Sequence, residues 1–232
     1  MTRRLRYPAA LLPPVWHALP WRPLAAAGAL GWLPVAAARP LSGGTGDTAL
    51  GLSLLRLAAL VAGVGLAFLL DDPARRTTEA VPVRRPVRAG LRLALVAPPL
   101  AAWWTAALLL LPAGSRPPSG AVSLEAAGIA GTALALAAAS VRLRAEPCPG
   151  TGAARGLLAL TAAVLLLPDR WSPLVSLQDA NWTAAHGWWA AILVVAALVW
   201  AVCVPEPLTG HRLLAGRAVR SPCGTSGPSR RS

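Results

Sequence analysis

Long apolar runs separated by short polar segments make up most of this chain. A helix needs about 20 apolar residues to cross the hydrocarbon core of a bilayer. Four runs approach or exceed that length, and they cover residues 49–70, 93–111, 121–141 and 187–204. Two shorter runs are candidates as well, 23–38 and 151–168. The pattern predicts an all-α fold, a polytopic transmembrane helical bundle of about six spans.

The two short runs each carry a feature that leaves an alternative open. Pro34 interrupts 23–38, so this segment is either a span or a tilted or interfacial helix. The run 151–168 reaches spanning length only if Arg155 extends its guanidinium back to the headgroups.

The runs divide the chain into three parts. Residues 1–22 form a basic N-terminal segment, 23–204 the transmembrane domain, and 205–232 a basic tail. The tail is rich in Ser, Gly, Pro and Arg, so we expect it to be disordered and to lie against anionic lipid.

The arginines predict the orientation, because cytoplasmic loops of membrane proteins carry an excess of basic residues. With six spans, 17 arginines fall on the side of the two termini and three, Arg39, Arg116 and Arg170, on the other. We therefore expect both termini in the cytoplasm and a multi-pass protein of the inner (plasma) membrane.

Composition excludes several function classes. Only 13% of the residues are charged, whereas soluble domains contain about 25%. All 22 basic residues are arginine, which rules out a P-loop lysine or a Schiff-base lysine in this chain. The net charge of +13 does not indicate nucleic acid, because the arginines flank apolar runs instead of clustering on a polar domain.

No catalytic or metal-binding pattern is recognisable. The three cysteines form no CxxC pair, the three histidines are far apart, and no nucleophile, base and orienting group share one face. We expect no catalytic residue, no metal and no cofactor. A lipid-modifying enzyme would need polar groups at one interface, and only the predicted outer loop of Gln178, Asp179 and Asn181 with Trp182 and His186 offers them.

Two charged side chains lie inside predicted spans. Arg56 is in the second span and Glu125 in the fourth, and both spans begin on the outer side. The two residues therefore lie at similar depth, and an ion pair between them is one interpretation. One interpretation is that these side chains form a gate or contact a substrate. The other is that they form a structural pair or reach separately to the membrane interface.

Ten tryptophans contrast with one Tyr and one Phe. Most lie near predicted span ends, which is typical of an aromatic belt at the membrane interface: Trp21, Trp171, Trp182, Trp188, Trp189 and Trp200. Trp103 and Trp104 lie deeper, after Pro98 and Pro99, so we expect a kinked span whose indole rings pack against neighbouring helices.

The segment that follows the second span carries Asp71, Asp72 and Pro73, then Thr77, Thr78 and an arginine-rich stretch that includes Arg84 and Arg85. With the Trp-rich last span, which closes at 204–207, it resembles the corresponding part of a group of compact bacterial six-span membrane proteins. Members of that group are commonly described as membrane components of ABC-type transporters or as uncharacterised integral membrane proteins. The resemblance covers about residues 60–207, and it implies no substrate-binding residue.

This resemblance implies a permease-like subunit that works with a separate ATPase and forms a homodimer or heterodimer. Asp71, Asp72, Pro73, Arg84 and Arg85 are then the candidate docking loop, with Asp72 capping a short helix that starts at Pro73. The residues alone also fit a simple end to a transmembrane helix. The alternative function is a non-transporting membrane scaffold or accessory protein.

Overall fold

The computed structural model describes residues 15–41, 47–71, 85–144, 149–168 and 171–204. Within these residues the chain is all-helical, without strands. The helices are α2 (Trp21–Leu41), α3 (Thr48–Ala67) with the 3₁₀ turn η1 (Phe68–Leu70), α5 (Arg85–Leu110), the 3₁₀ turn η2 (Ala113–Ser115), α6 (Ser119–Arg144), α7 (Gly150–Leu165) and α8 (Trp182–Cys203). The basic segments 1–14 and 205–232 and most of the predicted docking loop lie outside the described residues.

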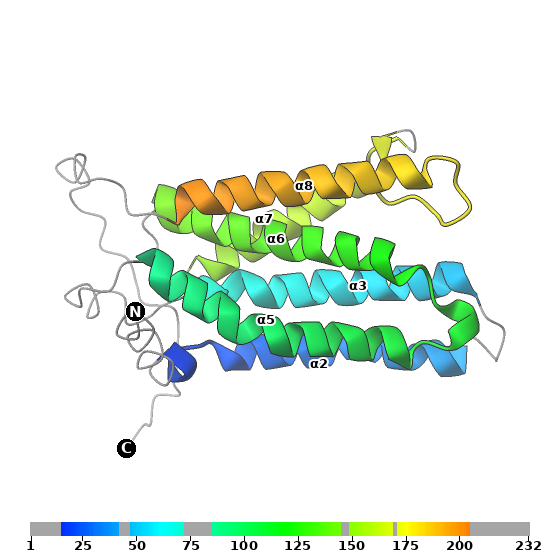
Figure 1. Cartoon of the computed structure of the whole chain (residues 1–232), viewed down its shortest axis with the longest axis horizontal. Coiled ribbons are helices and arrows are strands. Elements are labelled where there is room, and N and C mark those ends of the chain that lie inside the picture. The colour runs from blue at the N-terminus through cyan, green and yellow to red at the C-terminus, as the bar shows by residue number, and fades with distance from the viewer. Residues whose placement is uncertain (1–14, 42–46, 72–84, 145–148, 169–170, 205–232) are drawn as a thin grey trace, which may run out of the picture.

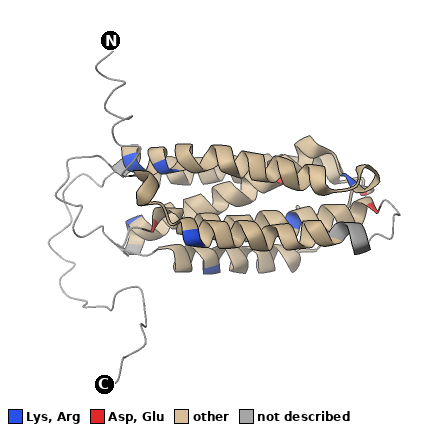
Figure 2. Cartoon of the chain, turned by 90° about the horizontal axis from the view of Figure 1, so that it is seen from below, with Lys and Arg blue, Asp and Glu red and all other residues tan. Residues whose placement is uncertain are grey.

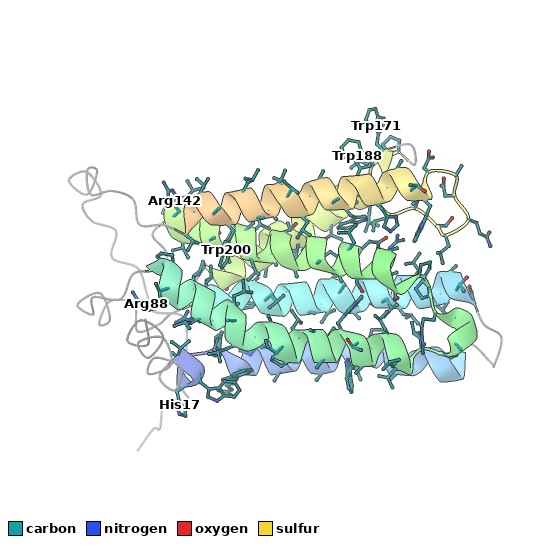
Figure 3. All side chains as sticks on the ribbon, in the orientation of Figure 1. His17, Arg88, Arg142, Trp171, Trp188 and Trp200 are labelled. Atoms are coloured by element: carbon teal, nitrogen blue, oxygen red, sulfur yellow. The ribbon has the colours of Figure 1, made fainter. Side chains whose placement is uncertain are left out.

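The helices run side by side and alternate in direction (Figure 1). Six antiparallel helices return the chain to the side where it began, so Trp21 and Cys203 lie at the same end of the bundle. We call this the arginine-rich end, because α2, α5 and α7 begin there with Arg22, Arg88 and Arg155 within their first two turns. Figure 2 shows basic residues gathered at that end, and Figure 3 places Arg88 and Arg142 there.

Four of the helices are long and apolar enough to cross a membrane, and they make this a membrane-associated, multi-pass protein. They are Thr48–Leu70, Pro86–Leu110, Ser119–Leu143 and Trp182–Cys203. The apolar side chains on the outside of the bundle fit this setting: Leu109, Leu198 and Val202 are each at least 60% exposed. In water such a surface would be a liability, whereas lipid covers it without cost.

The centre of the bundle consists of α3 and α6. α3 packs against α2, α6 and α7, and α6 also packs against α7 and α8. Small residues allow this close approach: a Cβ atom at Gly65 of α3 would collide with the Cβ of Ala27 of α2. Small residues at helix contacts are typical of membrane bundles, because close backbones gain van der Waals contact that lipid cannot supply.

Two tryptophans attach α5 to its neighbours. The indole N–H of Trp103 donates to the carbonyl oxygen of Gly28 in α2 at 3.0 Å, and that of Trp104 donates to Ser123 Oγ in α6 at 2.9 Å. These contacts match the predicted inward packing of the two rings. α5 changes direction along its length (Figure 1). Pro98 and Pro99 lie within it, and each lacks the backbone N–H that would continue the helix.

Several helix bounds differ from the sequence prediction. α2 continues through Pro34 for 21 residues, about 31 Å, so the first segment is a long helix. α5 begins at Arg85, eight residues before the predicted span. α8 begins at Trp182, so Trp182 and His186 are helical, and assigning them to the outer loop was wrong. Periodicity detects the apolar part of a helix and misses polar turns at its ends.

Candidate functional site

The helix α7 is shorter than its neighbours. α7 has 16 residues, about 24 Å, and therefore falls short of the roughly 30 Å hydrocarbon core. The chain that follows has no helical structure from Ser172 to Asn181, before α8 begins. Within this segment Pro173 and Val175 are buried. Their carbonyl groups need hydrogen-bond donors, because an unpaired carbonyl in an apolar interior costs several kcal/mol.

Side chains of two helices supply these donors. The indole N–H of Trp189 in α8 donates to the carbonyl oxygen of Pro173 at 3.0 Å. Arg56 Nη2 in α3 donates to the carbonyl oxygen of Val175 at 3.0 Å. Trp189 is only 7% exposed, so assigning it to an interfacial belt was wrong. Trp171 and Trp188 are half exposed, and Figure 3 shows them on the outside of the bundle, as a belt requires.

The structure brings Arg56 and Glu125 together as a two-point ion pair. Arg56 Nε lies 2.7 Å from Glu125 Oε2, and Nη2 lies 2.9 Å from Oε1. Glu125 is 1% exposed, so its charge is shielded from solvent by protein. Paired N–H donors that match both carboxylate oxygens form one of the strongest ionic contacts available to a protein.

Helix geometry explains why these two residues meet. α3 and α6 both begin at the end of the bundle opposite the arginine-rich end, and they pack against each other. Arg56 comes eight residues after Thr48 and Glu125 six after Ser119, which corresponds to about 12 Å and 9 Å along the helices. The side chains therefore reach the same level, as their positions in the sequence suggested.

His186 is a third polar group at this site. Its Nδ1 lies 2.7 Å from the carbonyl oxygen of Trp182, one helical turn earlier, so Nδ1 carries a proton and donates it. Its Nε2 is buried without a hydrogen-bond partner, 3.8 Å from Glu125 Oε1. The spacing of four residues between Trp182 and His186 was the available signal for this helical turn.

A cavity of about 500 Å³ lies beside the ion pair. Residues from α3, α6, α7 and α8 line it together with Pro173 and Leu174 of the irregular segment. The lining is apolar except for Arg56 and the hydroxyl groups of Ser53, Thr132 and Thr161. Size and lining are those of a small-molecule site with few polar contacts.

Asp71 contacts the interior at the arginine-rich end. Its Oδ1 accepts the backbone N–H of Gly150 at 2.7 Å, at the first residue of α7. Arg92, which is 7% exposed, donates to the carbonyl oxygens of Leu69 and Asp71 at 3.4 and 3.3 Å. Burial raises the pKa of Asp71 to about 6, although the Gly150 hydrogen bond and the charge of Arg92 oppose the rise.

Most of the other docking-loop candidates lie outside the described residues. Asp72, Pro73 and Arg84 lie outside the described residues, and Arg85 is the first residue of α5, without a described side chain. Asp71 differs from them because it links η1 to the start of α7 within the bundle. Across the described ranges, no three His, Cys, Asp or Glu side chains form a group able to hold a metal ion.

No family model, curated protein or solved structure matches the chain. The resemblance of the 71–92 segment to six-span transporter components therefore stays a prediction.

The first prediction concerns the ion pair. Replacing one member, as in Arg56→Met, leaves the buried Glu125 without its partner and the Val175 carbonyl without its donor, and we expect the free energy of unfolding to fall by roughly 3–5 kcal/mol. The double variant Arg56→Met/Glu125→Leu removes both charges and should recover most of that loss. Unfolding by SDS in mixed micelles, followed by tryptophan fluorescence, measures both; equal losses in the single and double variants would contradict the pairing.

The second prediction concerns Asp71. Its folded pKa of about 6 exceeds the ordinary value of 3.8, so between these values the folded state binds more protons than the unfolded state. Its contribution to stability is therefore greatest below about pH 4 and falls as the pH rises to about 6. Asp71→Asn retains an acceptor for the Gly150 N–H and does not titrate. We expect its stability relative to the parent protein to increase from pH 4 to pH 6; a constant difference would show that Asp71 titrates normally.

Proposed function

We propose that this protein is a permease-like subunit of the plasma membrane that crosses the bilayer six times, with both termini in the cytoplasm, and works with a separate ATP-binding protein. The short helix α7, with the irregular, side-chain-supported segment that follows it beside a cavity, is the feature that carries this proposal. Non-helical backbone at membrane depth occurs where it is enclosed by protein or lines a cavity, and the broken helices of transporters are the main example.

The order of the helices supports six crossings. Four helices have spanning length, α2 has 21 residues, and α7 becomes a crossing when the segment after it is included. The alternating directions then leave an even number of crossings (Figure 1). The arginine-rich end would face the cytoplasm, since basic residues are retained on that side.

The elements that flank the docking loop support an ATPase partner. η1 ends and α5 begins at the arginine-rich end, which is the cytoplasmic end in the proposed orientation. Asp71 contacts the start of α7, so a partner that moves this loop would act through Asp71 on α7, which lines the cavity. It would also act through α5 on the proline pair, which is not part of the cavity lining.

A non-transporting scaffold is the second candidate. The most apolar windows of α5 and α8 are only 11% buried within the bundle. Lipid or the helices of another membrane protein would cover these faces, and an accessory subunit needs such a surface. A scaffold function requires neither an ATPase nor movement of α7.

Purification of the tagged protein from its native membrane in a mild detergent, followed by mass spectrometry, distinguishes the two functions. We expect a stoichiometric ATPase that carries a Walker A motif, and we expect its recovery to fall at least about tenfold with Asp72→Asn/Pro73→Ala, a loss of some 1.4 kcal/mol or more in binding. Asp179→Asn, in the connection at the opposite end, is the matched control and should retain the ATPase. Recovery of the protein alone, under conditions that preserve a known transporter complex, would support the scaffold instead.

A further inference from the structure

The cavity beside Arg56 has its walls on four helices. Its lining includes Leu57 and Leu60 of α3, Ile129 of α6, Leu160 of α7 and Ile192 of α8. α6 packs against both α7 and α8, while the cavity separates the lining faces of these two helices. Leu57 and Leu160 are each 47% exposed, so the cavity opens sideways toward the apolar phase. A ligand that enters by this route comes from the bilayer.

The hydroxyl groups in the lining present no free hydrogen to a ligand. Ser53 donates to the carbonyl oxygen of Ala49, Thr132 to that of Gly128 and Thr161 to that of Leu157, at 2.8–3.0 Å. Each hydroxyl hydrogen is thus returned to its own helix, four residues earlier, as membrane helices commonly arrange. The indole N–H of Trp189 is likewise taken by Pro173.

Arg56 is the exception among the described lining residues. Its Nε and Nη2 bind the two carboxylate oxygens of Glu125, and Nη2 also donates to the Val175 carbonyl. Nη1, which carries two N–H groups, makes no hydrogen bond to another described residue, and the Arg56 side chain, 17% exposed, is part of the cavity lining. A guanidinium is never deprotonated in this setting, so these N–H groups need an acceptor.

The charge at the site restricts what that acceptor is. Glu125 already neutralises Arg56 and is itself buried behind it, so the cavity offers no acidic group to a cation. A carboxylate would add an uncompensated negative charge to an apolar site, which is costly. An uncharged carbonyl oxygen satisfies Nη1 without that cost.

We propose that the cavity binds one uncharged, apolar molecule from the bilayer, a long-chain ester or similar carbonyl compound, with its carbonyl oxygen on Arg56 Nη1 and its hydrocarbon chain between α7 and α8. This assignment deepens the permease proposal and names its substrate class. The site itself requires no ATPase, so its test is independent of the partner.

Photolabelling of the full chain in lipid nanodiscs tests the site. The probe is the methyl ester of a 16-carbon fatty acid that carries a diazirine in its chain, and peptide mass spectrometry locates the adducts. We expect adducts on residues 157–165 and 189–192. Excess methyl hexadecanoate should remove them about tenfold more effectively than hexadecane, which has no carbonyl to accept from Arg56; tenfold corresponds to about 1.4 kcal/mol.

Matched variants separate the cavity from the lipid-facing surface. Thr161→Trp fills the cavity and should reduce the adducts at least fivefold, while Leu158→Trp, on the same helix at a position outside the cavity lining, should not. Arg56→Met/Glu125→Leu should bind the chain but lose the preference for ester over hydrocarbon.

Equal competition by methyl hexadecanoate and hexadecane in the parent protein would overturn the proposal whether or not any variant folds. Adducts unchanged by Thr161→Trp would overturn it too, because the labelling would then come from surrounding lipid. Specific labelling without a recovered ATPase would refute the permease and keep the site; an ATPase without specific labelling would refute the site alone.

Discussion

The interior of this bundle depends on satisfying polar groups where no water is available. Arg56 is the centre of that arrangement, because one guanidinium binds the carboxylate of α6 and the backbone carbonyl of the segment that follows α7. Removing this side chain would leave both a buried charge and a buried carbonyl unpaired. The irregular backbone after α7 is therefore compatible with the interior only while Arg56 and Trp189 remain in place. The cavity lies beside this segment: α7 ends early, and Pro173 and Leu174 of the segment that follows it line one wall.

Tryptophan has a structural role here beyond the membrane interface. Three indole N–H groups bind within the bundle: Trp103 binds α2, Trp104 binds α6, and Trp189 binds the irregular segment. Each ring contributes a large apolar area and one directed donor, which suits an interior with few other donors. In a chain with one Tyr and one Phe, tryptophan thus supplies most of the aromatic packing and much of the side-chain hydrogen bonding between helices. At Trp171 and Trp188 the same residue type faces outward, so the type alone does not determine the role.

Apolar periodicity was sufficient to predict an all-helical membrane bundle, because four runs are long and nearly free of charge. The depth of Arg56 and Glu125 was also predictable, since both follow helix starts at the same end by a similar number of residues. The contact of Arg56 with the Val175 carbonyl could not be predicted, because no local sequence pattern marks a backbone carbonyl that folds back against a distant helix. The burial of Arg92 was not predictable either, because its acceptors are the backbone carbonyls of Leu69 and Asp71, more than 20 residues away in sequence. In both cases a tertiary contact compensates for a buried charged group that sequence rules treat as exposed.

The most direct test of the central ion pair is solid-state NMR of the protein in lipid bilayers, with ¹³C-labelled glutamate and ¹⁵N-labelled arginine. A Nε–Oε2 distance of 2.7 Å predicts a through-space cross-peak between a glutamate carboxylate carbon and an arginine side-chain nitrogen, and this cross-peak disappears in Glu125→Gln. Well-resolved glutamate and arginine signals without that cross-peak in the parent protein would contradict the account, because Arg56 could not then support both Glu125 and the segment after α7.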